Sequence, residues 1–309
     1  MLDSALTPYR PSDVSARNAS APDLIAAWLV GYKGNTREAY ARDMRDWATW
    51  CQLAGLHLLR VTRAHVELYA RDMSERRGLA AGTVARRLAA MASFYGYLLD
   101  EDLIAKSPMA RIRRPRLSPD STTMAPDRDE LRALLAAARA AGPREHALLC
   151  LLGLNGLRIS EAVGIDVDDL SSDRGHRLVR IMGKGSKPAL VPLATRTAAA
   201  IDGLLGNHAD SGIVSGPLFR GRDGGRLTRH AAYAVVKKLA RAIGIRKRLS
   251  PHSFRHGFVQ EAIRAGVPLR DVQLSVRHSS IATTQIYMDR MLALDNHATY
   301  RVADSIGDD

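Results

Sequence analysis

The sequence predicts a mainly helical protein with a small β-sheet, divided into two domains. Alanine-rich stretches with apolar residues at helical spacing cover most of the 309 residues. Residues 175–193 instead alternate apolar and polar side chains around a pair of glycines, which predicts a β-hairpin. Prolines at positions 108, 115, 119 and 126 interrupt the helical pattern and indicate a linker between the domains.

The first domain is expected over residues 20–105 as a bundle of helices. Asn35, with a glutamate three positions later, predicts a capped helix start, and Thr62 predicts the start of another helix. The three tryptophans, Trp28, Trp47 and Trp50, are expected to form the core of this bundle rather than a surface on which bases stack.

The linker is placed at residues 106–126, and the second domain, with its C-terminal tail, at residues 127–309. Helices are expected over residues 127–142 and 144–165, followed by the hairpin with Lys184 at its turn, and the chain becomes helical again from Thr228 to its end. The stretch "GKGS" at the hairpin lacks the upstream glycine of a phosphate-binding P-loop, which excludes that motif.

The charge of the chain predicts a polyanionic partner. Lys and Arg number 45 against 32 Asp and Glu, a net charge of +13. Residues 1–117 hold 18 basic and 12 acidic side chains (+6), and residues 118–309 hold 27 and 20 (+7), so the excess is not confined to a tail. Both domains are therefore expected to contact nucleic acid; the alternative is a charge that serves solubility alone.

Several arginines lie off the apolar stripes and are candidates for contacts with DNA phosphates. The alternative for each of them is an ordinary solvated charge. The candidates in the first domain and the linker are Arg42, Arg45, Arg86, Arg87, Arg113 and Arg114.

Cysteine content and hydropathy point to a cytoplasmic protein without membrane contact. Cys51 and Cys150 each lie in an apolar stretch, so a cysteine-rich zinc cluster is excluded and a disulfide framework is disfavoured. The apolar runs are shorter than the roughly 20 residues of a membrane span. The N-terminus lacks the basic-then-apolar order of a signal peptide.

The stretch "SPHSFRHGF", residues 250–258, predicts a site for an anion. Ser250 is a good N-cap and Pro251 suits the first helical position, so His252 lies in the first turn and Arg255 one turn later on the same face. Two cationic groups so placed repel each other unless an anion lies between them, and a helix N-terminus favours one. The alternative is a capped surface helix that binds nothing, and metal ligands are lacking beside the histidines.

Other cationic residues and a tyrosine complete a pattern that resembles a known family. Arg158, Lys184 on the hairpin, the His-x-x-Arg of the stretch above, His278 and then Tyr287 occur in the order and spacing of the tyrosine recombinases, or phage integrases. The matching stretches are "GLRISEAVGI", "GKGSK", "PHSFRHGF", "AGVPLRDVQ" and "HSSIATTQIY". They span roughly the last 190 residues, whereas the helical domain resembles the family's core-binding domain more loosely.

The resemblance implies a fold and a function. The fold is an N-terminal SAM-like core-binding bundle plus a C-terminal α+β catalytic domain. The function is that of a site-specific recombinase or integrase, which cleaves and rejoins DNA through a 3′-phosphotyrosyl intermediate without metal, ATP or another cofactor. Its substrate is double-stranded DNA with paired half-sites. The size resembles Xer-type enzymes without a separate arm-binding domain, acting as a homo-tetramer on synapsed DNA or with a related recombinase.

The resemblance also assigns the movements of protons. Tyr287 is the nucleophile, and its phenol, with an ordinary pKa of about 10, needs help to lose its proton. His252 assists that transfer, and Lys184 protonates the departing 5′-oxygen as general acid.

Three further residues are implied to bind the transition state. Arg158 and Arg255 present planar forks of donors to the non-bridging oxygens, and His278 donates another hydrogen bond. The family usually has Leu-Gly before this second histidine, where this chain has Val276 and Arg277. Because arginine resists backbone conformations that glycine accepts, either the turn differs here or Arg277 adds a cation to the site.

Two other functions stay open at this point. A type IB topoisomerase shares the phosphotyrosine chemistry but relaxes DNA as a monomer, and a catalytically inactive DNA-binding protein would keep the fold. The 22 residues after Tyr287 are expected to form a short helix that packs either on a neighbouring subunit or on its own domain.

Overall fold

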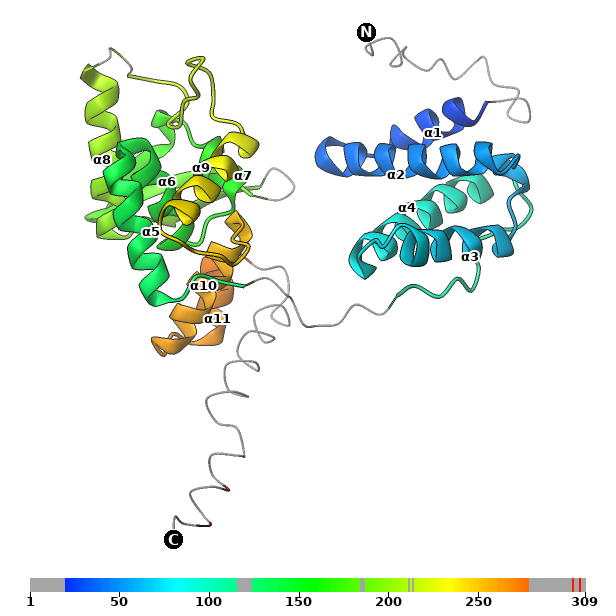
Figure 1. Cartoon of the computed structure of the whole chain (residues 1–309). Coiled ribbons are helices and arrows are strands. Elements are labelled where there is room, and N and C mark those ends of the chain that lie inside the picture. Colours follow the sequence, from blue (N-terminus) through cyan, green and yellow to red (C-terminus); the bar gives the residue numbers. More distant parts are fainter. Residues whose placement is uncertain are drawn as a thin grey trace. The chain divides into compact units, whose positions relative to one another are not determined.

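The computed structural model describes residues 20–115, 124–183, 187–210, 212, 214–277, 302 and 306. They belong to two units, one within residues 1–118 and the other within residues 119–309 (Figure 1). The predicted tail helix lies outside the described residues, apart from residues 302 and 306. No helix in the described ranges combines the length and the apolar composition that a membrane crossing requires.

The N-terminal unit is a bundle of helices, as predicted. Its described residues form the helices α1 (Ala21–Leu29), α2 (Gly34–Leu53), α3 (Arg63–Arg71) and α4 (Ala81–Asp100). Helix α2 packs against α1 and α4. A 3₁₀ turn, Leu58–Arg60, and a π-helical turn, Asp72–Arg76, flank α3.

Aromatic side chains fill the core of this unit. Trp28 and Trp47 are buried, and the half-buried Trp50 stacks on Trp47 with ring centroids 5.4 Å apart. The indole N–H of Trp47 donates to the hydroxyl of Tyr95 at 3.1 Å, and that hydroxyl donates to the carbonyl of Leu58 at 3.1 Å. The predicted role of the tryptophans in the core is confirmed, since Trp47 packs on Trp50, Trp28 packs on Tyr40, and the indole N–H groups of Trp28 and Trp47 are hydrogen-bonded.

Of the two helix starts predicted in this unit, one is confirmed and one is wrong. Thr62 is the N-cap of α3. Asn35 is not the cap of α2, because the helix begins at Gly34 and its N-cap is Lys33. Gly34 has φ 54°, a left-handed conformation that glycine adopts readily, so the chain turns into the helix before it reaches Asn35.

The C-terminal unit combines helices with a small antiparallel sheet. The strands β1 (Leu170–Asp173), β2 (His176–Met182) and β3 (Pro188–Pro192) pair in the order β1-β2-β3, so the predicted hairpin is confirmed and extended by a third strand. The helices are α5 (Arg128–Ala141), α6 (Pro143–Gly153), α7 (Ile159–Gly164), α8 (Thr195–Asp210), α9 (Arg229–Ala242), α10 (Pro251–Arg264) and α11 (Leu269–Val276).

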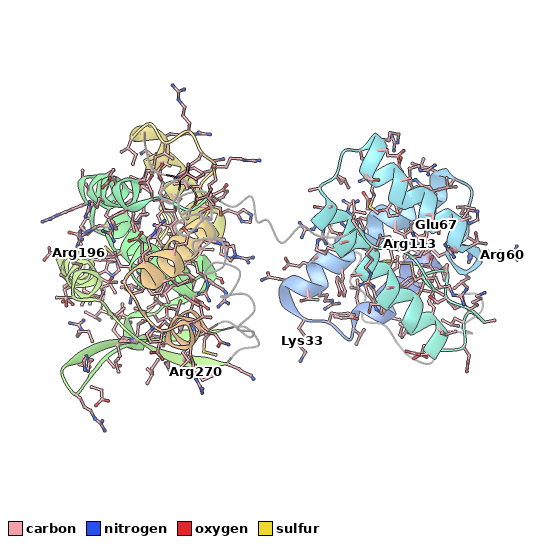
Figure 2. All side chains as sticks on the ribbon, turned by 90° about the horizontal axis from the view of Figure 1, so that it is seen from below. Lys33, Arg60, Glu67, Arg113, Arg196 and Arg270 are labelled. Atoms are coloured by element: carbon pink, nitrogen blue, oxygen red, sulfur yellow. The ribbon has the colours of Figure 1, made fainter. Side chains whose placement is uncertain are left out.

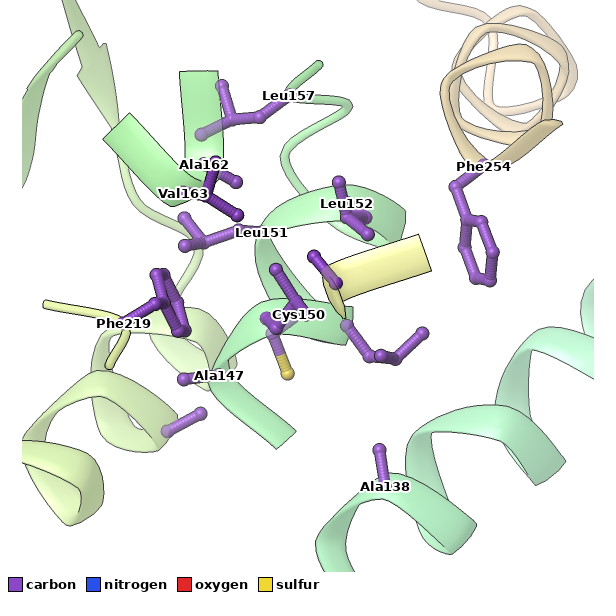
Figure 3. Close-up of a cluster of buried hydrophobic side chains, with 14 of the residues drawn as sticks. Ala138, Ala147, Cys150, Leu151, Leu152, Leu157, Ala162, Val163, Phe219 and Phe254 are labelled. Atoms are coloured by element: carbon purple, nitrogen blue, oxygen red, sulfur yellow. The ribbon is translucent and has the colours of Figure 1, made fainter. Parts of the chain in front are cut away.

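Helix α6 forms the centre of this unit. Every side chain from Ala147 to Leu152 is buried, because α5, α7, α8, α9 and α10 all pack against α6. Figure 3 shows this cluster, with Phe219 and Phe254 contributed from other segments. On β2, Val179 and Ile181 are buried, so one face of the sheet belongs to the same core. A helix segment that is apolar all round must be buried on every side. Because α7 and α10 both pack on α6, this core fixes the two helices that carry Arg158 and Arg255.

The predicted helix over residues 144–165 is interrupted, which corrects the sequence interpretation. Helix α6 ends at Gly153 and α7 begins at Ile159. Between them Gly156 has φ 61°, and the side-chain amide of Asn155 donates to the carbonyl of Pro192 at 2.8 Å. The glycine permits the left-handed turn, and the contact with β3 replaces helical hydrogen bonds. The break places Arg158 at the N-cap position of α7.

Candidate active site

The N-terminus of α10 forms as predicted. Ser250 is its N-cap, with the hydroxyl accepting from the backbone N–H of Ser253 at 3.3 Å, and Pro251 is the first helical residue. The cap fixes where the helix begins, so His252 lies in the first turn and Arg255 one turn on. Phe254, between them, is buried in the core and anchors the helix.

Arg255 lies inside the unit and holds the break between α6 and α7. Its side chain is 2% exposed, and Nη1 donates to the carbonyl oxygen of Gly156 at 2.9 Å. This hydrogen bond joins residues 99 positions apart in the sequence. It fixes the guanidinium against Gly156, which precedes Arg158 by two positions in the chain. A buried guanidinium held in this way is preorganised and has little freedom to lose when it binds an anion.

Arg158 pairs with Glu161 and still reaches solvent. Its Nη1 donates to Oε1 of Glu161 at 2.7 Å, and its backbone N–H donates to Oε2 at 2.8 Å. The Arg158 side chain is 35% exposed, whereas that of Glu161 is 2% exposed. The pairing with Glu161 thus orients a guanidinium that remains accessible to a ligand.

Glu161 stays ionised although it is buried. Burial acts to raise its pKa, but the hydrogen bond from the Arg158 backbone and the charges of Arg277 and Arg158 outweigh burial, so the pKa is lowered. The carboxylate therefore balances part of the positive charge that collects around it.

His252 is held in its neutral form. Burial lowers the pKa of its imidazole, and the nearby charges of Arg255 and Arg158 lower that pKa further. Its ring meets the ring of His256 edge-on, with centroids 4.5 Å apart. The structure thus brings Arg158, His252 and Arg255 into electrostatic contact, with a histidine that is free to accept a proton near neutral pH.

Arg277, which departs from the family pattern, keeps the turn that glycine would make, so of the two alternatives that the sequence left open the structure supports the added cation. As the C-cap of α11 it has φ 52° and ψ 48°, the left-handed conformation that glycine usually provides. Its Nη2 donates to Oε2 of Glu161 at 2.8 Å, so it also adds a cation beside Arg158.

Three predicted site residues lie outside the described residues: Lys184, His278 and Tyr287. Their roles stay predictions. In sequence, Lys184 lies between β2 and β3, and His278 follows the C-cap of α11 directly.

In the N-terminal unit, two of the candidate DNA-contacting arginines form ion pairs between helices. Arg86 of α4 pairs with the buried Asp43 of α2. Arg87 pairs with Asp46, which also accepts two hydrogen bonds from Arg77, at 2.8 and 2.9 Å. The side chain of Arg86 is 46% exposed and that of Arg87 is 17% exposed. These pairs fix α2 against α4.

The remaining candidates are exposed. Arg42 and Arg45 lie on α2 and form no salt bridge with any residue that the structure describes. Arg113 and Arg114 are also exposed, and Arg113 is marked in Figure 2. Since their guanidiniums reach solvent, their contact with phosphates stays a prediction.

The sequence interpretation missed Asn155 and Gly156, which shape the site without entering the chemistry. Their signal was present, because an Asn-Gly dipeptide within a helical pattern marks a turn. Gly156 also packs tightly: a Cβ placed there would lie 2.7 Å from Cδ1 and 2.9 Å from Cγ of Phe258.

We expect Gly156→Ala to destabilise the C-terminal unit by about 2 kcal/mol or more, because alanine must adopt a left-handed backbone and displace the ring of Phe258. The thermal unfolding midpoint should fall by roughly 5 °C. The matched control is Gly164→Ala on α7, where a Cβ meets no atom within 4 Å. Equal midpoints for the two variants would contradict the described packing.

Comparison with known proteins gives consistent matches over both units. The sequence profile of the phage integrase family matches residues 126–292, and that of the phage integrase N-terminal SAM-like domain matches residues 30–102.

Curated relatives match along most of their length. The chain is 36% identical to tyrosine recombinase XerD of Shewanella oneidensis over 287 residues, covering 88% of this chain and 93% of that protein. It is 35% identical to tyrosine recombinase XerC of Xanthomonas campestris over 256 residues, covering 82% and 78% of the two chains.

Solved structures share the fold at lower identity. A XerH site-specific recombinase bound to a palindromic difH substrate aligns with TM-score 0.70 and 20% identity, covering 91% of this chain and 85% of that one. The Tn1549 transposon integrase in complex with circular intermediate DNA aligns with TM-score 0.67 and 20% identity, covering 87% and 94%.

Proposed function

Since this chain belongs to the phage integrase family and is a site-specific DNA recombinase of the tyrosine type, we propose that Tyr287 forms its covalent bond to DNA. The phenol oxygen attacks the phosphorus, the bond to the 5′-oxygen breaks, and a 3′-phosphotyrosine and a free 5′-hydroxyl result. Because the new ester keeps the energy of the broken one, a 5′-hydroxyl of a partner strand reverses the step without ATP.

The observation that supports this proposal best is the cationic group formed by Arg158 and Arg255 around a neutral His252. In the transition state, negative charge collects on the non-bridging oxygens of the phosphate, and the two guanidiniums offer donors to them. Arg255 is held by Gly156 and Arg158 by Glu161, so both are oriented before DNA arrives. His278 donates a further hydrogen bond in this proposal.

Two residues move protons in the proposed reaction. His252, kept neutral by burial and by the adjacent arginines, accepts the proton of Tyr287. Lys184, on the connection between β2 and β3, donates a proton to the departing 5′-oxygen. The reaction as proposed takes its acid, base and nucleophile from the chain itself.

The N-terminal unit supplies DNA contacts in the same proposal. Residues 20–105 act as the core-binding domain, residues 106–126 as the linker and residues 127–309 as the catalytic domain. Arg42, Arg45, Arg113 and Arg114 are exposed and contact phosphates, as does the half-exposed Arg86. Arg87 is mostly covered, so its ion pair with Asp46 contributes chiefly by orienting α4.

We further propose that the enzyme acts in the cytoplasm on paired half-sites, with four subunits on two synapsed duplexes. The substrate of the related XerH is palindromic, which fits two protomers per site. The four subunits are copies of this chain or include a related recombinase.

The function is tested on DNA whose target site the purified protein has itself selected from a randomised library. Supercoiled plasmids carrying two copies of the site should yield deletion or inversion products, and plasmids without the site should remain supercoiled. Relaxation of the site-free plasmid by monomeric protein would instead favour a topoisomerase. Loss of both reactions with intact binding would indicate a DNA-binding protein without catalysis.

We expect an acid limit to DNA cleavage set by His252. Its pKa is lowered in the folded protein, so the neutral base is present at pH 7 and is lost as the pH falls through a value below 6.5. The cleavage rate of a nicked duplex should therefore decline at some pH below 6.5, and His252→Gln should be slower and lack this limb. An unchanged acid limb in the variant would assign the titration to another group.

A further inference from the structure

Arg277 is a backbone outlier next to the catalytic residues. Its φ of 52° and ψ of 48° lie in the left-handed region, which an arginine enters only at a cost in free energy. Its backbone N–H donates to the carbonyl of Leu274 at 3.0 Å and closes the last turn of α11. Glycine would make the same turn without strain, so the arginine side chain is expected to supply a compensating contact.

That contact is an ion pair with a buried carboxylate. Nη2 of Arg277 donates to Oε2 of Glu161 at 2.8 Å, and Nη1 donates to the carbonyl of Ser275 at 3.1 Å. The Arg277 side chain is 20% exposed and that of Glu161 is 2% exposed, so water screens the pair weakly. The two residues are 116 positions apart, and the pair therefore ties the end of α11 to α7.

Glu161 is shared between two arginines. Its Oε1 accepts from Nη1 of Arg158, while its Oε2 accepts from both the backbone N–H of Arg158 and the side chain of Arg277. Any movement of the carboxylate changes the direction of the Arg158 guanidinium. Arg277, the other partner of this ion pair, immediately precedes His278 in the sequence.

We propose that Arg277 is a positioning residue, which through Glu161 fixes Arg158 and at the same time holds the end of α11 from which His278 follows. The inference rests on the proposed roles of Arg158 and His278. Arg277 itself need not touch the phosphate. In this arrangement the two arginines share one negative charge, so the site keeps a net positive charge for DNA.

The experiment compares three substitutions that separate charge from backbone strain. Arg277→Gly relieves the strain and removes the cation, Arg277→Asn tolerates the left-handed backbone without a cation, and Arg277→Lys keeps a cation and the strain. The measurements are the single-turnover cleavage rate of a nicked duplex with the selected site at saturating protein, and the Kd for the intact duplex.

We expect Arg277→Gly and Arg277→Asn to lower the cleavage rate about tenfold or more with a nearly unchanged Kd, because Arg158 loses its orientation. Arg277→Lys should retain more of the rate than Arg277→Gly. If backbone strain at position 277 alone set the cleavage rate, Arg277→Gly would cleave faster than Arg277→Lys, since glycine adopts the left-handed conformation more readily than lysine. The matched control is Arg174→Gly, at an exposed arginine with φ 48° in the turn between β1 and β2, which should cleave like the unmodified protein.

A double-mutant cycle tests the route through Glu161. In a Glu161→Gln background, Arg277→Gly should change the cleavage rate little further, because the shared carboxylate charge is already gone. Full-rate cleavage by Arg277→Gly, or equal effects of that substitution in both backgrounds, would overturn the inference. If the unmodified protein forms no covalent complex at all, the proposed function fails instead, so the two failures are distinguishable.

Discussion

Replacing Tyr287 with phenylalanine should abolish the covalent protein–DNA complex and leave DNA binding intact. The substitution removes one oxygen and keeps the ring, so the surfaces that neutralise phosphates are unaffected, whereas the nucleophile is lost. On a nicked duplex the unmodified protein should accumulate as a labelled covalent band, because the cleaved fragment diffuses away before religation. The Tyr287→Phe band should fall to background.

The controls for this experiment use another tyrosine and the binding reaction. Tyr300→Phe makes the same change beyond the matched motif and should leave the covalent band in place. Gel-shift titrations at matched salt should give Kd values within about twofold for both variants. A covalent band from Tyr287→Phe would show that another residue is the nucleophile.

Replacing the leaving 5′-oxygen with sulfur should restore cleavage to Lys184→Ala but not to Arg158→Ala. Lys184→Ala is expected to slow cleavage of ordinary DNA by about 10²–10⁴, the usual contribution of a general acid. A thiolate leaves without protonation, so the bridging 5′-phosphorothiolate makes the acid unnecessary. Arg158 stabilises the non-bridging oxygens, which the substitution does not change, and its loss should still cost about 10²–10³.

The comparison is internally controlled because both variants are measured on both substrates. Lys187→Ala, at the start of the segment that leads into β3, gives a matched lysine substitution close to the turn. Equal rescue of Lys184→Ala and Arg158→Ala by sulfur would contradict the division of roles. If the sulfur substrate restores cleavage to neither variant, Lys184 is not the general acid.

Local sequence signals determined most of the fold. The caps Thr62 and Ser250 and the hairpin alternation of Val179 and Ile181 involve residues within a few positions of one another, and each of the five family motifs is itself a short stretch. Such short-range patterns act on the backbone directly, through capping hydrogen bonds and through the periodic burial of side chains. The mainly helical architecture with a small sheet, and membership of the family, were predicted on this basis and are confirmed.

Errors occurred where neighbouring signals disagreed. The apolar pattern around residues 144–165 favoured one helix, while the Asn-Gly dipeptide within it favoured a turn, and the contact of Asn155 with β3 decided for the turn. The DNA contact of Arg87 stays a prediction, and the structure adds an ion pair that the sequence of its own helix does not indicate. Its ion pair with Asp46 exists because α2 and α4 pack together across 41 residues of sequence.

The sequence by itself predicts which residues the reaction uses, because each lies in a short motif whose order and spacing can be read along the chain. The tertiary structure alone decided how three of them are held. The buried Arg255 donates to the carbonyl of Gly156, and Arg158 shares Glu161 with Arg277. Burial, and then the charges of Arg255 and Arg158, lower the pKa of His252 and keep it neutral. These contacts join residues 99 and 116 positions apart, where no periodicity or capping rule operates. Their geometry follows from the packing of α7, α10 and α11, and that packing sets both the charge balance and the pKa values of the site.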